Sequence, residues 1–143
     1  MAETTQEVGA ERFSKRLGEL SLCSLGGVPR RNVDRQILLK SAALSIGRSA
    51  TFSEAEVNWA LLHWRSAFGL ELDHVSWRRL LVDAGYLQRD RARTVYSVAQ
   101  PSEERTGVRF TPDVEEVVVL QVADDFRREA ASKREGYLRS HRP

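Results

Sequence analysis

The residues best suited to chemistry are arginines that gather in one short part of the chain. Between Asp73 and Thr94, five arginines stand against three aspartates, which leaves this segment with a net charge of +2. A guanidinium group offers paired donors that match phosphate oxygens and the edge of guanine. The segment therefore predicts contacts with nucleic acid, and its candidate binding residues are His74, Ser76, Arg78, Arg79, Arg89, Arg91 and Arg93. A salt-bridged surface, with Arg78 or Arg79 paired to Asp83 or Glu54, would have the same composition.

The other ionisable residues do not form the patterns that catalysis or metal binding requires. None of the three histidines has a cysteine or a second histidine at metal-ligand spacing. The carboxylates of Glu115 and Glu116, and of Asp124 and Asp125, are sequence neighbours that would point about 100° apart on a helix. The Gly26-Gly27 pair lacks the lysine and the spacing of a phosphate-binding loop. We therefore expect no enzyme, no cofactor and no metal site.

Length and composition indicate one small domain with extensions. The chain has 143 residues and a hydrophobic fraction of 41%, which permits a core. A membrane-spanning helix needs about 20 apolar residues, and no apolar run in the chain approaches that length. The first residues are acidic and polar, so they do not resemble a secretory signal. The lone cysteine, Cys23, cannot form an internal disulfide, which favours a reducing compartment. We expect a cytoplasmic protein with no membrane contact.

Two helices with clear start signals precede most of these arginines. Ser53 and Glu56 have the spacing of a capping box, and a stripe of apolar residues at helical spacing follows them. Asp73 is suited to cap the next helix, Trp77 lies on its apolar face, and Gly85 is suited to end it. An earlier helix is expected over about residues 32–45. The arginines at 78 and 79 would therefore belong to the third helix of a consecutive set.

The segment after Gly85 predicts a hairpin. Residues 86–89 and 94–99 are short β-like runs, and Asp90-Arg91-Ala92 would join them. Three helices that end in such a hairpin are typical of a winged helix-turn-helix, whose second motif helix enters the major groove. We expect a mainly α fold with a small β-hairpin, formed by a winged helix-turn-helix core with flanking N- and C-terminal helices. The alternative is a plain helical bundle that carries a hairpin.

The chain divides into five expected segments. They are a disordered N-terminus (1–11), an N-terminal helix and turn (12–28), a winged-helix-like domain (29–100), a linker (101–112), and a C-terminal helix and tail (113–143). Residues 113–122 are rich in valine, so a strand is an alternative there. On a helix, this region would expose an apolar face to a protein partner or a second copy, formed by Val114, Val118, Val122 and Phe126.

Three stretches of sequence carry a resemblance to a known family. SEAEVNWALLHW, DHVSWRRLLVDAGYLQRD and TVYSV resemble an uncharacterised bacterial domain family over roughly residues 34–98. Trp77 stands where a smaller aliphatic residue is usual, and Ser97 where a second aromatic residue often follows. The hallmark residues are Asp73, Arg78, Arg79, Leu81, Val82, Asp83, Gly85, Leu87, Arg89 and Tyr96. The family occurs alone and joined to winged-helix regulators of the metal-sensor type, so the resemblance implies a role associated with DNA.

Together these observations predict a small bacterial DNA-binding protein that acts as a transcription regulator. The third core helix and the arginine-bearing wing would read duplex DNA, and a homodimer would read two half-sites. The alternative is a protein-interaction module, or a protein associated with structured RNA or the ribosome, that uses the core as a scaffold and the C-terminal helix as the partner face.

Overall fold

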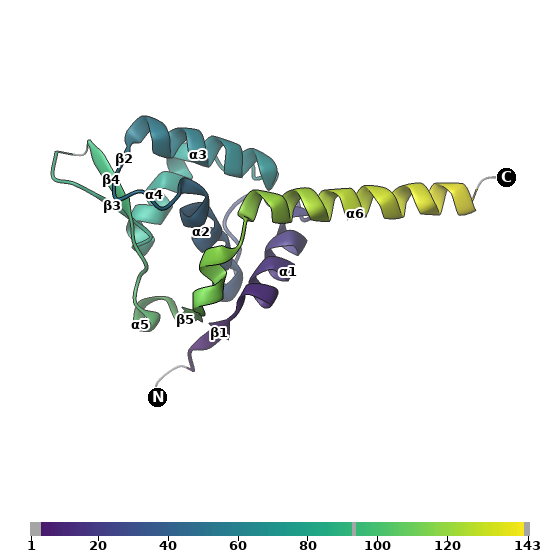
Figure 1. Ribbon diagram of the computed structural model, residues 1–143, viewed down its shortest axis with the longest axis horizontal. Helices are drawn as coiled ribbons and strands as arrows, with labels where there is room; N and C mark the ends of the chain where they lie inside the picture. The colour runs from purple at the N-terminus through teal and green to yellow at the C-terminus, as the bar shows by residue number, and fades with distance from the viewer. Residues whose placement is uncertain (1–3, 93, 142–143) are drawn as a thin grey trace.

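The computed structural model describes residues 4–92 and 94–141 and is mainly helical, with a small antiparallel sheet (Figure 1). Its longer helices are α1 (Ala10–Ser21), α2 (Asn32–Ile46), α3 (Glu54–Ala67), α4 (His74–Ala84) and α6 (Val119–Ser140). Two short helical segments are α5 (Glu103–Thr106) and the 3-10 turn η1 (Pro112–Glu116). The strands are β1 (Gln6–Val8), β2 (Phe52–Ser53), β3 (Leu87–Arg89), β4 (Val95–Val98) and β5 (Val108–Phe110).

The antiparallel sheet contains the expected hairpin and one strand from an earlier part of the chain. Its order is β2-β4-β3, with Leu87 opposite Val98 and Phe52 opposite Tyr96. The side chains of Phe52, Leu87 and Tyr96 are buried, so this face of the sheet belongs to the core. The sheet therefore attaches the hairpin to the segment that leads into α3.

The core forms around α2, whose residues are buried on most sides. Helices α1, α3 and α6 all contact it, which explains why its sequence lacks a clear polar face. Trp64 of α3 meets Trp77 of α4 edge to face, with ring centroids 5.0 Å apart, and its indole nitrogen donates to Ser41 Oγ at 2.9 Å. The apolar stripe of α3 and the inner face of α4 therefore point into this core, as the helical spacing predicts.

The N-terminal segment is ordered where the sequence predicts disorder. Strand β1 pairs in parallel with β5, with Gln6 opposite Val108 and Val8 opposite Phe110. Val8 and Val108 are buried, and this apolar burial stabilises both short strands. The expected disorder over 1–11 is therefore wrong for residues 6–8, and residues 1–3 lie outside the described part. The expected linker over 101–112 likewise contains α5 and β5.

The C-terminal helix begins later than its sequence indicates. Proline occupies the first turn of η1, Val117 and Val118 have extended backbone angles, and α6 starts at Val119. The strand alternative for residues 113–122 is wrong. The first half of α6 packs on α1, and its second half extends beyond the rest of the molecule (Figure 1). In the described residues, no helix combines the length and apolar character needed to span a membrane.

Candidate nucleic-acid interface

Local hydrogen bonds fix both ends of α4. The Ser76 amide donates to Asp73 Oδ1 at 3.0 Å, and the Asp73 carboxyl has a lowered pKa, because hydrogen bonds from the side chain and amide of Ser76 favour its ionised form. At the other end, Gly85 has a φ of 90°, and the Tyr86 amide donates to the Leu81 carbonyl at 3.0 Å. The start and stop signals read from the sequence are both confirmed.

The inner and outer faces of α4 are distinct. Trp77 and Leu81 are fully buried, so they anchor the helix in the core. Val75, Arg79 and Asp83 are exposed and recur every four residues, which places them on one outward stripe. His74 is half-buried in the first turn, and the hydroxyl of Ser76 contributes to capping at Asp73. The outer stripe is therefore the part of α4 that is available to a ligand.

The outer stripe borders a hollow between α4 and β3. The hollow has a volume of about 220 Å³, and it is lined by Val75, Arg78, Arg79, Val82, Asp83 and Arg89. Within residues 4–92 and 94–141, neither Arg79 nor Arg89 forms an ion pair or a hydrogen bond through its side chain. The structure thus brings three sequence-predicted arginines to one hollow and leaves two of them free for an external acceptor.

Arg78 differs from its neighbours because α3 holds its guanidinium group. Arg78 Nη2 lies 3.1 Å from Glu54 Oε1, and Nη1 donates to Asn58 Oδ1. Only 17% of the Arg78 side chain is exposed. Arg78 therefore joins α4 to α3 and pairs with Glu54, as the salt-bridged alternative predicts, and both of its Nη atoms already serve internal acceptors.

The hairpin presents Arg91 next to a well-bonded turn. The Asp90 amide donates to the Val95 carbonyl at 2.9 Å, and Asp90 Oδ1 accepts from the amides of Thr94 and Val95 at 2.8 and 3.2 Å. Arg91 is exposed and has no side-chain partner among the described residues. Arg93, which was predicted to act with it, lies outside the described residues. Asp90 thus orders the turn that carries Arg91.

The apolar residues expected to form a partner face do not share a surface. Val114 is fully buried in η1, whereas 67% of Val118 is exposed. Val122 and Phe126 are half-buried on α6, and the Phe126 ring occupies the space where a Cβ on Gly18 would lie. The expected face is therefore wrong as one surface, because α1 of the same chain covers part of it and the core takes Val114.

The segment that contains α4 and the hairpin is similar to a known protein family. A family model of bacterial proteins, described as "Uncharacterized protein conserved in bacteria (DUF2087)", matches residues 24–98, just over half of the chain. The chain belongs to the DUF2087 family. The resemblance expected over roughly residues 34–98 is thereby confirmed and extended toward the N-terminus. No curated protein and no solved structure matches the chain.

The DUF2087 match separates the molecule into two parts. It contains α2, α3, α4 and the three-stranded sheet, so the outer stripe of α4 and the hairpin lie within the family segment. Helices α1 and α6 and the strand pair β1-β5 lie outside it.

In the described residues, no three histidine, cysteine, aspartate or glutamate side chains gather as a metal site would require.

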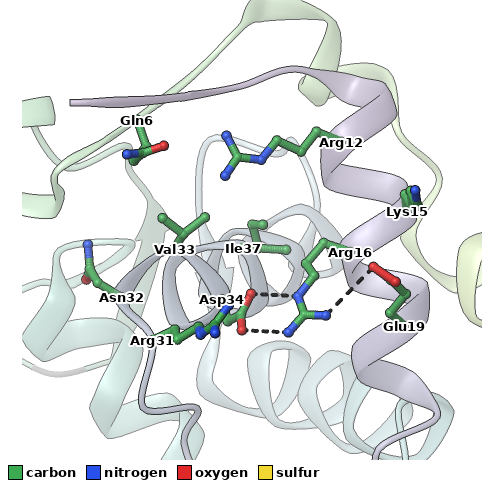
Figure 2. A pocket seen from close by; sticks show the side chains of 10 residues that line it. All are labelled: Gln6, Arg12, Lys15, Arg16, Glu19, Arg31, Asn32, Val33, Asp34 and Ile37. Atoms are coloured by element: carbon green, nitrogen blue, oxygen red, sulfur yellow. Dashed lines mark hydrogen bonds and ion pairs between the residues drawn. The ribbon is translucent and has the colours of Figure 1, made fainter. Parts of the chain in front are cut away.

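Sequence reasoning missed a second group of cations, at the junction of α1 and α2. Arg12, Lys15 and Arg16 of α1 line a hollow together with Arg31, which precedes α2 (Figure 2). Their spacing of three to four residues on α1 was a usable signal for a shared helix face. The contribution of Arg31 had no local signal, because it depends on how α1 packs against α2.

Proposed function

We propose that this DUF2087 protein is a bacterial, cytoplasmic DNA-binding protein with a winged-helix core, and that it regulates transcription. The chain order α2-β2-α3-α4-β3-β4, with sheet order β2-β4-β3, supports this fold assignment. In a winged helix, the strand after the first helix joins the hairpin, and the third helix serves as the recognition helix. Here α4 corresponds to that helix and the β3-β4 hairpin to the wing.

The observation that carries the proposal is the pair of exposed, unpartnered arginines that α4 and β3 bring to one hollow. Arg79 and Arg89 line the same hollow and have no internal acceptor within the described residues. A guanidinium group without an internal acceptor can donate hydrogen bonds to base edges in the major groove or to phosphate oxygens. The exposed stripe of α4 beside these groups leaves room for a duplex to approach. Arg79 is the proposed base contact, whereas Arg91 at the wing would contact phosphate.

The experiment begins with selection of a preferred duplex from a random pool. Fluorescence anisotropy then measures affinity for that duplex and for a scrambled one across a salt titration. Arg79→Ala should weaken binding to the preferred duplex by about 1–3 kcal/mol, and should weaken the scrambled duplex less. Arg91→Ala should weaken both duplexes similarly and reduce the salt slope by about one unit.

A matched control removes an equal charge elsewhere. Arg128 lies on α6 and pairs with Asp124 at 2.7 Å, so Arg128→Gln should leave both affinities and the salt slope unchanged. If Arg79→Ala and Arg91→Ala bind like Arg128→Gln, the proposed surface is wrong. If the wild-type chain selects no duplex and binds none at low salt, the proposed function itself is wrong.

A protein partner is the second candidate, and the distal half of α6 favours it. The second half of α6 extends from the body (Figure 1). Tyr137 and Leu138, in the last turn of this helix, expose 62% and 57% of their surface. A second copy of the chain is the simplest partner, and a dimer would supply two half-site readers. Light scattering should then show a dimer for the wild type and a monomer for Tyr137→Ala/Leu138→Ala. A monomeric wild type would contradict self-association through this part of α6.

A further inference from the structure

The junction of α1 and α2 contains a hollow that is separate from the proposed DNA surface. Its volume is about 690 Å³, which falls in the range of small-molecule sites. Arg12 and Arg16 extend into it from α1, Lys15 lies at its edge on the same helix, and Arg31 lines it from the residue before α2 (Figure 2). No residue that lines this hollow also lines the hollow at α4 and β3.

The two carboxylates in the hollow are already committed to one arginine. Arg16 Nε and Nη2 donate to the two oxygens of Asp34 at 2.8 and 2.9 Å, and Arg16 Nη1 lies 3.7 Å from Glu19 Oε1. Because four cationic side chains face two carboxylates, the lining has a net charge of +2. The Asp34 carboxyl responds to this environment: its pKa is lowered, chiefly by the Arg16 hydrogen bond and further by the charges of Arg31 and Arg12.

The other cations have donors to spare. Arg12 donates from one nitrogen to the Glu7 carbonyl at 2.9 Å. Among the described residues, Lys15 and Arg31 form no ion pair and no side-chain hydrogen bond. The start of α2 adds to the positive potential, since no side chain caps the amides of its first turn. Half-buried Val33 supplies an apolar part of the lining.

We propose that this hollow binds a small molecule that carries a phosphate monoester. A phosphate monoester has a charge of about −1.5 to −2 at pH 7 and three acceptor oxygens, which match the +2 lining and the free donors of Lys15 and Arg31. The organic part of the ligand would lie against Val33. Since α1 lies outside the matched segment 24–98, the site joins the DUF2087 segment to the flanking helix of this chain.

The test uses the full chain, with inorganic phosphate and phenyl phosphate as probes. Isothermal titration and thermal unfolding are measured against sodium chloride at equal ionic strength. Both probes should bind and raise the unfolding temperature, whereas Lys15→Gln/Arg31→Gln should bind phenyl phosphate at least tenfold more weakly. The control, Arg128→Gln/Lys133→Gln, removes the same charge from α6 and should bind like the wild type. Arg16 is left intact because its pair with Asp34 joins α1 to α2.

The outcomes separate this site from the proposed DNA surface. Loss of phenyl phosphate binding in Lys15→Gln/Arg31→Gln, with duplex affinity and unfolding temperature in chloride unchanged, supports the proposal. It is overturned if phosphate gives the wild type no more stabilisation than chloride, or if the double variant binds like its control. It is also overturned if the double variant loses duplex affinity while the wild type binds neither probe, since the hollow would then serve the DNA backbone. None of these results depends on Arg79.

Discussion

The ion pair between Arg16 and Asp34 allows a sharp test of how α1 is held on α2. Two hydrogen bonds join the groups, and the Asp34 side chain is 11% exposed whereas that of Arg16 is 37% exposed. A hydrogen bond to a charged group contributes about 1.5–3 kcal/mol when it is well shielded, and solvent screening reduces this for an exposed partner. We therefore expect the whole pair to contribute on the order of 1–3 kcal/mol to the free energy of unfolding.

The unequal burial of the two groups predicts unequal costs. Arg16→Gln leaves the carboxylate of Asp34 charged and mostly buried, which costs more than the lost attraction alone. Asp34→Asn leaves Arg16, whose guanidinium group can turn toward solvent. We expect Arg16→Gln to lower the free energy of unfolding by about 2–3 kcal/mol and Asp34→Asn by about 1 kcal/mol.

The cost of Arg16→Gln should also depend on pH. The pKa of Asp34 is lowered in the folded protein, first by the Arg16 hydrogen bond, so the stabilisation is complete above the unfolded pKa of about 3.9. It is lost as the pH falls through the folded pKa, because the carboxyl then becomes protonated in both states. Urea unfolding followed by circular dichroism at pH 7, 5 and 3.5 should show a full difference at the first two values and a smaller one at the last. An equal difference at all three, or a larger cost for Asp34→Asn, would refute the reasoning.

Three further predictions concern helix ends, helix packing and the arginine surface. Gly18→Ala should destabilise the protein by about 1–3 kcal/mol in urea unfolding, because the new Cβ meets the Phe126 ring. In the Phe126→Ala background, the same Gly18→Ala substitution should cost much less, because the ring is gone. Gly85→Ala should cost about 1 kcal/mol or more, because its φ is 90° and a Cβ would lie 2.6 Å from Arg105 Nη1; an unchanged denaturation midpoint would contradict this. Glu54→Gln should strengthen duplex binding severalfold in anisotropy at low salt, because it weakens the hold on Arg78 and removes a negative charge; the neutral exchange Asn58→Ser should have a smaller effect.

The elements that depend on neighbouring residues could be predicted from the sequence. The capping box of Ser53 and Glu56 is present, with hydrogen bonds of 3.0 and 3.1 Å, because its partners are three residues apart. Asp73 and Gly85 bound α4 for the same reason. The β3-β4 hairpin also follows from local signals, since two β-like runs lie on either side of a short turn.

Elements that depend on distant partners could not be predicted in this way. Strand β1 exists because it pairs with β5, about a hundred residues later, and its three residues have no local pattern of their own. Strand β2 has two residues and depends on Tyr96 and Val95 of β4. The late start of α6 similarly follows from the burial of Val114 and Val119 on either side of an extended link.

The candidate site shows where local and distant information meet. Arg78 and Arg79 are adjacent, so on a helix their side chains point about 100° apart, and only one can lie in the middle of an outward face. The sequence leaves open which of the two arginines pairs with an acidic residue, and the packing of α4 on α3 places Arg78 against Glu54. Arg78 takes that position and loses its free donors, whereas Arg79 keeps them. Mutagenesis of this surface should therefore treat the two as opposites: loss of Arg78 acts through stability, and loss of Arg79 acts through affinity.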